Sequence, residues 1–249
     1  MNINSLSKEE KFALFYGILL GDGCLSHYFG KDKKEYFTVT ITGHNPDDLP
    51  FYKEVIAPLL FSFGRRSASI KRRKDCNAIE FNFSNKSIFA KVASYGFPVG
   101  KKGAKLFIPK EFYEKGLVGF VVAGFVATDG SLVLTKNPNK YYPRVEGNGI
   151  CRVLIKEITD YLVSQGLFGK FYRSKRRQGS NFGYGAKLPW RFQFNGKKNL
   201  ILFNEKIGFA NPKHYRKFLN FLRYDEEYDK NIRGTPCIEH YRIRNKVKL

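Results

Sequence analysis

The chain has 249 residues, of which 43% are hydrophobic, and it carries 44 Lys and Arg against 22 Asp and Glu, a formal net charge of +22. This length allows one large or two modest domains, and the apolar content is sufficient for a core. The charge indicates a polyanionic partner, with nucleic acid as the first expectation and an acidic membrane surface as the second.

Several other classes of protein are disfavoured by the sequence. No run of about 18 apolar residues indicates a membrane span, and the first residues, 1–4, lack the pattern of a signal peptide. The four cysteines are scattered without CxxC spacing, which argues against a disulfide framework or a zinc site: Cys24, Cys76, Cys151 and Cys237. We therefore expect an intracellular protein that is not secreted, in the cytoplasm, the nucleoid or an organelle matrix.

The first half of the chain predicts a helix, two strands, a helix, two strands and a closing helix. Ser7 and Glu10 form a capping-box pattern that starts the first helix at about Lys8. The expected elements are helix 8–20, strands 24–28 and 36–42, a helix from 47 or 48 to 63, strands 65–74 and 78–84, and helix 86–95. Apolar and polar residues alternate in 36–42 and 78–84, so these strands are expected to bury one face.

The second half repeats this order. The expected elements are helix 111–127, strands 131–135 and 142–145, helix 152–165, a basic strand 170–178, strand 190–195, and helices 199–207 and 213–222.

Two stretches in these halves are nearly the same. Phe15–Gly23 and Val122–Gly130 are apolar runs that end in Asp-Gly. Each carries small residues four positions apart: Gly17 and Gly21 in the first, Ala123 and Ala127 in the second. Residues with this spacing share one face of a helix, and small side chains let two helix backbones approach closely. The pattern predicts that the two helices pack against each other.

The aspartates that end these helices, Asp22 and Asp129, are electrostatically unfavourable there. A carboxylate at a helix C-terminus faces the negative end of the helix dipole, so a cation is expected nearby. If the helices pack in parallel, the two carboxylates meet at one end and repel each other unless cations lie between them. The arrangement predicts a site for hard divalent metal ions.

The repeat is supported by the spacing of its landmarks. Asp22 and Asp129 are 107 residues apart, Phe81 and Phe192 are 111 apart, and the Gly-Phe pairs that begin at Gly96 and Gly208 are 112 apart. We interpret the chain as two αββαββα units. The first unit spans 1–100, a linker spans 101–110, and the second unit spans 111–223. A tail, 224–249, is first acidic and then basic, and is expected either to contact DNA or to be disordered.

At this point the sequence resembles the LAGLIDADG homing endonucleases in their single-chain, two-motif form. The two Asp-Gly stretches match the positions of that family's signature motifs, and the resemblance extends over about 8–222. It implies an α+β fold of two pseudo-symmetric units. Each unit contributes a four-stranded antiparallel sheet, the two sheets form a saddle, and the motif helices pack at the centre.

The resemblance also implies an activity. It is hydrolysis of both strands of a long, asymmetric double-stranded DNA site, leaving 3′ overhangs, by a monomer with internal pseudo-twofold symmetry. The implied metal is Mg²⁺, with Mn²⁺ as a substitute and Ca²⁺ binding without cleavage. The implied metal-site residues are Asp22 and Asp129 together with Gly21 and Thr128, and the basic residues near the scissile phosphates are Lys102, Lys105 and Lys213.

The polar face of each sheet is expected to lie in the major groove, where Arg can read guanine and Asn or Gln can read adenine. In the first unit these residues are Tyr36, Thr38, Thr40, Arg72, Lys74, Glu80 and Asn82. In the second unit they are Arg144, Arg173, Lys175, Arg177, Arg191 and Gln193.

Two departures from the family pattern concern the centre of the site. The second motif has Thr128 where the first has Gly21, so the two halves are expected to pack unequally. Many relatives carry a glutamine where the second strand ends, and here that place holds Gly43 followed by His44, or Gly147-Asn148 in the second unit.

The sequence leaves two alternatives of the same fold open. One is an RNA-binding intron maturase, which needs intron RNA and no cleavage, and the other is a catalytically degenerate DNA-binding protein. Both acidic motif residues remain, which favours the endonuclease. The first motif begins close to residue 1 and no splicing-domain residues flank it, so we expect a free-standing, intron-encoded enzyme.

Overall fold

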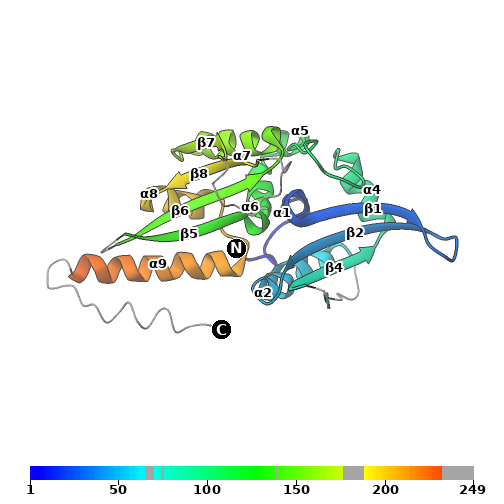
Figure 1. Ribbon diagram of the computed structural model, residues 1–249, viewed down its shortest axis with the longest axis horizontal. Helices are drawn as coiled ribbons and strands as arrows, with labels where there is room; N and C mark the ends of the chain where they lie inside the picture. The colour runs from blue at the N-terminus through cyan, green and yellow to red at the C-terminus, as the bar shows by residue number, and fades with distance from the viewer. Residues whose placement is uncertain (65–69, 74–75, 138–139, 176–187, 232–249) are drawn as a thin grey trace.

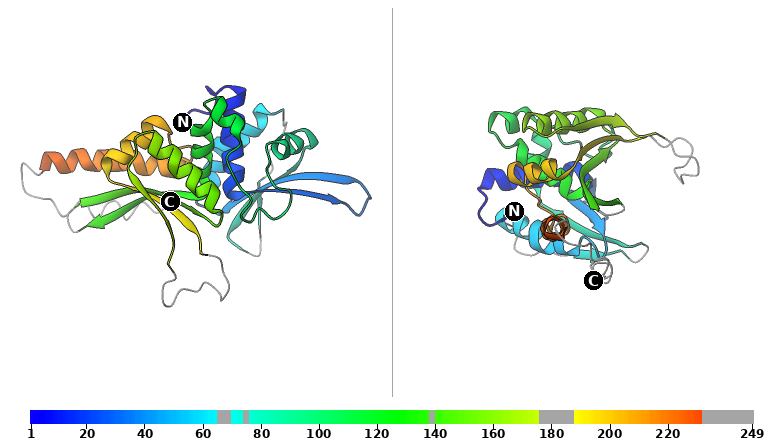
Figure 2. Two further views of the ribbon diagram at one scale, coloured as in Figure 1. Left: turned by 90° about the horizontal axis from the view of Figure 1, so that it is seen from above. Right: turned by 90° about the vertical axis from the view of Figure 1, so that its left-hand side faces the viewer.

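The computed structural model describes residues 1–64, 70–73, 76–137, 140–175 and 188–231. In this part of the chain two four-stranded antiparallel sheets have the strand orders β1-β2-β4-β3 and β5-β6-β8-β7. The β1–β2 and β5–β6 hairpins extend in opposite directions (Figure 1). The left view of Figure 2 shows the helices gathered on one side of both sheets. The predicted α+β fold of two pseudo-symmetric units forming a saddle is confirmed.

The first unit follows the predicted order. Its helices are α1 (Lys8–Asp22), α2 (Leu49–Phe51), a π-helical turn η1 (Tyr52–Ile56), α3 (Ala57–Ser62) and α4 (Lys86–Ser94). Its strands are β1 (Gly23–Phe29), β2 (Glu35–His44), β3 (Ile70–Arg72) and β4 (Ala78–Ser84). The capping box at Ser7 and Glu10 is present, with both reciprocal hydrogen bonds.

The helix expected from 47 or 48 to 63 is interrupted by a π turn. Ala57 N donates to Tyr52 O, five residues back. Pro58 follows in the first turn of α3 and has no N–H to continue the regular ladder. Proline at this point accounts for the wider turn, which the sequence pattern alone did not predict.

The second unit repeats the arrangement. Its helices are α5 (Lys110–Glu114), α6 (Val118–Thr128), α7 (Arg152–Ser164), α8 (Lys197–Lys206) and α9 (Pro212–Asn231). Its strands are β5 (Gly130–Asn137), β6 (Lys140–Gly149), β7 (Gly169–Arg173) and β8 (Trp190–Asn195). The described part of the predicted basic strand 170–178 ends at Arg173.

Two predicted helix boundaries are wrong. The single helix expected over 111–127 is two helices, because Gly116 has φ +68° and ends α5 in the left-handed conformation that glycine tolerates. The last helix does not stop at Leu222 but continues to Asn231. Asp225 is buried there and pairs with Lys140 and Lys197, so the first acidic residues of the predicted tail belong to a packed helix.

The core follows the alternation of the strands. The central aromatic residues come from both units and are almost fully buried: Phe15, Tyr16, Phe81, Phe125, Phe192 and Phe194. On β2 the side chains of Val39 and Ile41 point into this core, as predicted. None of the helices in the described residues is long and apolar enough to span a membrane.

Candidate active site at the paired helix ends

Helices α1 and α6 pack side by side, and small residues set their separation. A Cβ on Gly17 would lie 2.0 Å from Val121 O, and a Cβ on Gly124 would lie 2.2 Å from Leu14 O. The backbones of the two helices are therefore in contact at Gly17 and Gly124, where any larger side chain would clash. The α6 residues at this closest approach are Val121, Gly124 and Thr128, and the last two lie one position beyond the alanines that the sequence pattern indicated.

Thr128 makes the two helix ends unequal, as its difference from Gly21 predicted. Its hydroxyl donates to Phe125 O at 3.0 Å and to Gly124 O at 3.3 Å within its own helix. A Cβ on Gly21 would lie 2.0 Å from the Thr128 Oγ1 atom. The threonine therefore occupies the space opposite Gly21, and only glycine fits there.

The two aspartates come together at this end of the helix pair. Asp22 is the last residue of α1 and Asp129 is the C-cap of α6. Burial, and then repulsion from Asp129, raise the pKa of Asp22 to about 7. Burial also raises the pKa of Asp129, while the positive charge of Lys102 opposes that rise. The predicted pair of facing carboxylates is present.

Lys102 supplies the cation that the C-terminus of α1 needs. Its ammonium group donates to Leu19 O and Leu20 O, each at 3.2 Å, and to Gly21 O. It acts on both aspartates, and burial lowers its own pKa. A positive charge at this position stabilises the negative end of the helix dipole. The ammonium also engages the Gly21 carbonyl, so that oxygen has a partner other than a metal ion.

The other two predicted lysines differ from each other. Lys213 lies at the start of α9 and pairs with Asp48 of the first unit, with Nζ and Oδ1 2.6 Å apart. Its charge lowers the pKa of Asp22. Lys105 is exposed, and its side chain makes no hydrogen bond or ion pair within the described residues. The structure therefore brings Lys102 and Lys213 to the aspartates but not Lys105.

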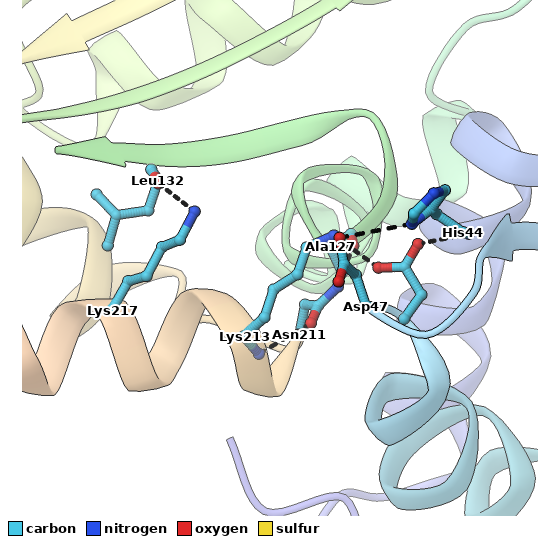
Figure 3. A network of polar contacts seen from close by, with 8 residues as sticks. His44, Asp47, Ala127, Leu132, Asn211, Lys213 and Lys217 are labelled. Atoms are coloured by element: carbon cyan, nitrogen blue, oxygen red, sulfur yellow. Dashed lines mark hydrogen bonds and ion pairs between the residues drawn. The ribbon is translucent and has the colours of Figure 1, made fainter. Parts of the chain in front are cut away.

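Asp48 and Asn211 belong to this region and were not among the predicted site residues. Asp48 Oδ2 accepts from His44 N at 2.9 Å, in addition to the Lys213 contact. Asn211 Nδ2 donates to Ala127 O at 2.8 Å, at the C-terminal end of α6. Figure 3 shows Lys213, at the start of α9, and Asn211, just before that helix, reaching toward the end of α6 and the β2–α2 turn. In the sequence, position 48 was indicated only as a possible start of the helix that runs to 63.

On the first sheet, strand register confirms a common face for most of the predicted polar residues. Thr40 pairs with Asn82, Thr42 with Glu80, and Thr38 with Ser84. Tyr28 and Tyr36 are paired and stacked on the same face. The predicted residues on this face are Tyr36, Thr38, Thr40, Glu80 and Asn82.

Arg72 was placed on the wrong face. It pairs with Ile79, a core residue, whereas Lys71 pairs with Glu80 on the polar face. A register difference of one residue moves a side chain to the opposite face of a sheet. Lys74 lies outside the described residues.

On the second sheet, too, strand register places several of the predicted polar residues on one face. Arg144 pairs with Asn195, Gln193 with Glu146, and Arg191 with Asn148, so the predicted Arg144, Arg191 and Gln193 share one face.

Arg173 pairs with Trp190, which stacks on Phe171 on the core side, so its predicted position is wrong. Lys170 and Tyr172 of the same strand lie on the polar face instead. Lys175 is exposed beyond the end of β7. Arg177 lies outside the described residues.

The polar face of the second sheet is internally ordered. Tyr172 donates its hydroxyl to Gln193 Oε1 at 2.9 Å, and Gln193 Nε2 donates to Asn195 Oδ1 at 2.9 Å. Arg144 Nε lies 2.7 Å from Glu146 Oε2. These contacts fix the orientation of polar side chains on the exposed face of the sheet.

Solved structures with this architecture carry the comparison. A variant of I-DmoI in complex with nicked target DNA and manganese superposes with a TM-score of 0.56 at 17% identity. The match covers 84% of this chain and 97% of the I-DmoI chain. The chain has the LAGLIDADG homing endonuclease fold. The I-LtrWI LAGLIDADG homing endonuclease bound to target DNA gives a TM-score of 0.53 at 12% identity, over 90% of this chain and 91% of the other.

A third structure agrees with these two. The LAGLIDADG meganuclease I-AabMI bound to uncleaved DNA gives a TM-score of 0.53 at 12% identity, over 88% of this chain and 92% of the other. Identities this low establish the shared fold and do not by themselves carry over an activity.

The sequence comparisons are less specific. No family model matches the chain. A probable translation initiation factor IF-2 of Methanocaldococcus jannaschii is 23% identical over 247 residues, which is 98% of this chain. The chain spans only 18% of the length of that protein.

Proposed function

We propose that the protein is a site-specific endonuclease that hydrolyses both strands of a long, asymmetric double-stranded DNA target. One observation carries the proposal: two packed helices end together in Asp22 and Asp129, between two sheets that each present a polar face. The net charge of +22 supports a polyanionic substrate. Two sheets with different polar residues suit a target whose two halves differ.

The donor atoms at the helix ends fit divalent metal ions. Two carboxylates are hard oxygen ligands, and Mg²⁺ is commonly held by one or two carboxylates together with waters and substrate phosphates. Burial raises the pKa values of both aspartates, and repulsion from Asp129 adds to the rise at Asp22, so a bound cation would favour their charged forms. No cluster of three or more His, Cys, Asp or Glu suited to a metal occurs in the described residues, so further ligands would come from DNA and water.

The residues around the pair have distinct roles in this proposal. Bound divalent ions would activate water and stabilise the leaving 3′ oxygen. Asp22 and Asp129 would hold these ions, while Lys102 and Lys213 add positive charge beside the phosphates. The polar faces of the sheets would bind the major groove on either side. Cuts across the minor groove would leave 3′ overhangs.

The target is found by selection and then tested for cleavage. Random DNA duplexes that bind the protein in Ca²⁺ are isolated, and the complexes are then given Mg²⁺ or Mn²⁺. We expect breaks in both strands that map to one position. Asp22→Asn and Asp129→Asn should retain binding but slow cleavage by at least roughly 100-fold, the upper range for groups that merely support a metal ligand.

Other outcomes separate the alternatives. Selected duplexes that bind tightly but are never cut would indicate a DNA-binding protein of the same fold. Tight binding of structured intron RNA with no duplex selected would indicate a maturase. Full activity in either aspartate variant would disprove the metal assignment. An intron-encoded origin stays a prediction from the sequence.

A further inference from the structure

Tyr52 has a buried hydroxyl group with no partner. The residue opens the π-helical turn η1 and is 1% exposed, and its hydroxyl finds no hydrogen-bond partner among the described residues. A buried polar group left unpaired costs about 1–3 kcal/mol of stability. π-Helical turns occur frequently at functional sites, where they alter the direction of a side chain. Both features indicate that the hydroxyl serves a purpose other than packing.

The hydroxyl lies where the end of β2 meets the β2–α2 turn. A Cβ on Gly43 would lie 3.0 Å from the Tyr52 hydroxyl oxygen, 2.8 Å from its Cε2 and 3.2 Å from Asp48 Oδ2. Only glycine at this point lets the phenol and the carboxylate come so close to the strand. The glycine that replaces the family's usual polar residue therefore makes room for Tyr52.

Acidic groups surround the phenol. Burial raises its pKa above the ordinary value, and the charges of Asp22, Asp48 and Glu80 raise it further. The group therefore stays protonated and remains a donor. Asp48 already accepts hydrogen bonds from Lys213 and from His44 N. Glu80 Oε1 accepts from Asn82 Nδ2 at 3.2 Å. The Asp22 carboxylate accepts no hydrogen bond from the residues that the structure describes, so of the three acids it is the one without a donor.

At the equivalent place in the second unit, the described residues hold no such hydroxyl group. Gly23 pairs with Ile41 and Gly130 with Gly147, so Gly43 and Gly149 occupy equivalent places, each two residues further along. A Cβ on Gly149 would meet Ile155 Cδ1 at 3.2 Å. The position of Tyr52 is thus taken by an aliphatic side chain near Asp129.

The two units also differ at a second pair of equivalent positions. Asp48 precedes Tyr52 by four positions, and Cys151 precedes Ile155 by four. The Cys151 thiol donates to Leu106 O at 3.0 Å. The tyrosine and aspartate of the first half of the site correspond to isoleucine and cysteine in the second.

We propose that Tyr52 is a positioning residue for the first half of the site only. Its hydroxyl donates through one water to the Asp22 carboxylate and fixes the orientation in which that carboxylate binds a divalent cation. The inference rests on the proposed function for its effect on DNA cleavage. Its effect on metal binding can be measured without any cleavage.

Terbium luminescence tests the inference on the full-length protein. Excited tyrosine transfers energy to a nearby Tb³⁺ ion, so titration reports the affinity for the ion. We expect Tyr52→Phe to weaken Tb³⁺ binding by roughly tenfold, the lower range for loss of a group that orients a metal ligand, and to reduce the sensitised emission. Ile155→Val, at the equivalent place in the second unit, is the matched control and should leave the titration unchanged.

The outcomes distinguish this inference from the proposed function. If Asp22→Asn abolishes tight Tb³⁺ binding while Tyr52→Phe behaves like the wild type, the inference fails and the metal site stands. If Asp22→Asn also has no effect, both fail. A cooperative thermal melt of Tyr52→Phe shows that the variant is folded.

A strand-resolved assay gives the second reading. With a selected duplex labelled on each strand, Tyr52→Phe should slow one cut by roughly tenfold more than the other, so a nicked intermediate accumulates. Equal slowing of both cuts would overturn a role confined to one half.

Discussion

The aspartates that end α1 and α6 combine three unfavourable features at single residues. Each lies at the negative end of a helix dipole, each is partly buried, and each lies near another carboxylate. Lys102 offsets part of this by donating to three carbonyl groups at the end of α1. What remains is a deficit of positive charge that a bound divalent ion would remove.

This deficit predicts how the stability of the metal-free protein changes with pH. The pKa of Asp22 is raised to about 7, so the folded state holds its proton more firmly than the unfolded state does. Stability from this group is complete below its unfolded pKa of about 4 and is lost as pH rises through 7. Asp22→Asn stays neutral, so at pH 8 we expect its free energy of unfolding to exceed the wild-type value by about 1–3 kcal/mol.

Denaturant titrations at pH 5 and pH 8 in EDTA measure this difference. The gain should shrink at pH 5, where the wild-type carboxyl is already protonated. Asp47→Asn, which changes an exposed carboxylate nearby, is the control and should behave like the wild type at both pH values. A variant at Asp22 that is less stable than the wild type at pH 8 would contradict the charge deficit.

At the scale of elements, the contact between α1 and α6 sets the separation of the aspartates. Gly17→Ala would place a methyl group 2.0 Å from the backbone oxygen of Val121, and neither helix backbone can yield locally. We expect a loss of about 3 kcal/mol in the free energy of unfolding, at the upper end for overpacked cores. Chemical denaturation measures the loss.

Gly119→Ala is the matched control for this prediction. Gly119 is also a helical glycine in α6, but the tightest contact of its added Cβ would be with the hydroxyl of Tyr161, at 3.1 Å, and the next atoms lie 3.9 Å away. The gain in helix propensity, about 1 kcal/mol for Gly to Ala, should offset the tight contact. Equal destabilisation by both substitutions would show that the helix contact is not the cause.

The elements also show what the sequence could predict and what it could not. Repeat spacing and alternation predicted the order of helices and strands, because periodic burial is a local property. The end of α9 could not be predicted, because it depends on ion pairs of Asp225 with Lys140 and Lys197, which are distant in sequence. The faces of Arg72 and Arg173 depended on strand register. The position of the Tyr52 hydroxyl depends on the space beside Gly43, nine residues earlier, which the sequence pattern does not reveal.

Across the whole molecule, the two halves share one architecture but differ in chemistry. The polar face of the second sheet carries Arg144, Arg191 and Lys170, whereas the first carries Lys71 and Glu80 with hydroxyl and amide groups. Arg191 and Glu80 hold equivalent positions, opposite Asn148 and Thr42. A single chain with two unlike faces can distinguish the two ends of an asymmetric duplex, which an identical pair of subunits cannot do.

The net charge of +22 predicts a steep dependence of DNA affinity on salt. Each phosphate that a Lys or Arg neutralises releases counterions, and a protein with six to ten such contacts loses roughly 10³–10⁵ in affinity between about 50 and 200 mM salt. Fluorescence anisotropy in Ca²⁺ measures binding of a selected duplex over this range.

Lys170→Gln, on the polar face, should reduce the slope by about one unit if it contacts a phosphate. Lys110→Gln, exposed in the helical layer beside Glu114, should leave the slope unchanged. A flat salt response would contradict binding across the saddle, and equal effects of both lysine variants would place the DNA elsewhere on the surface.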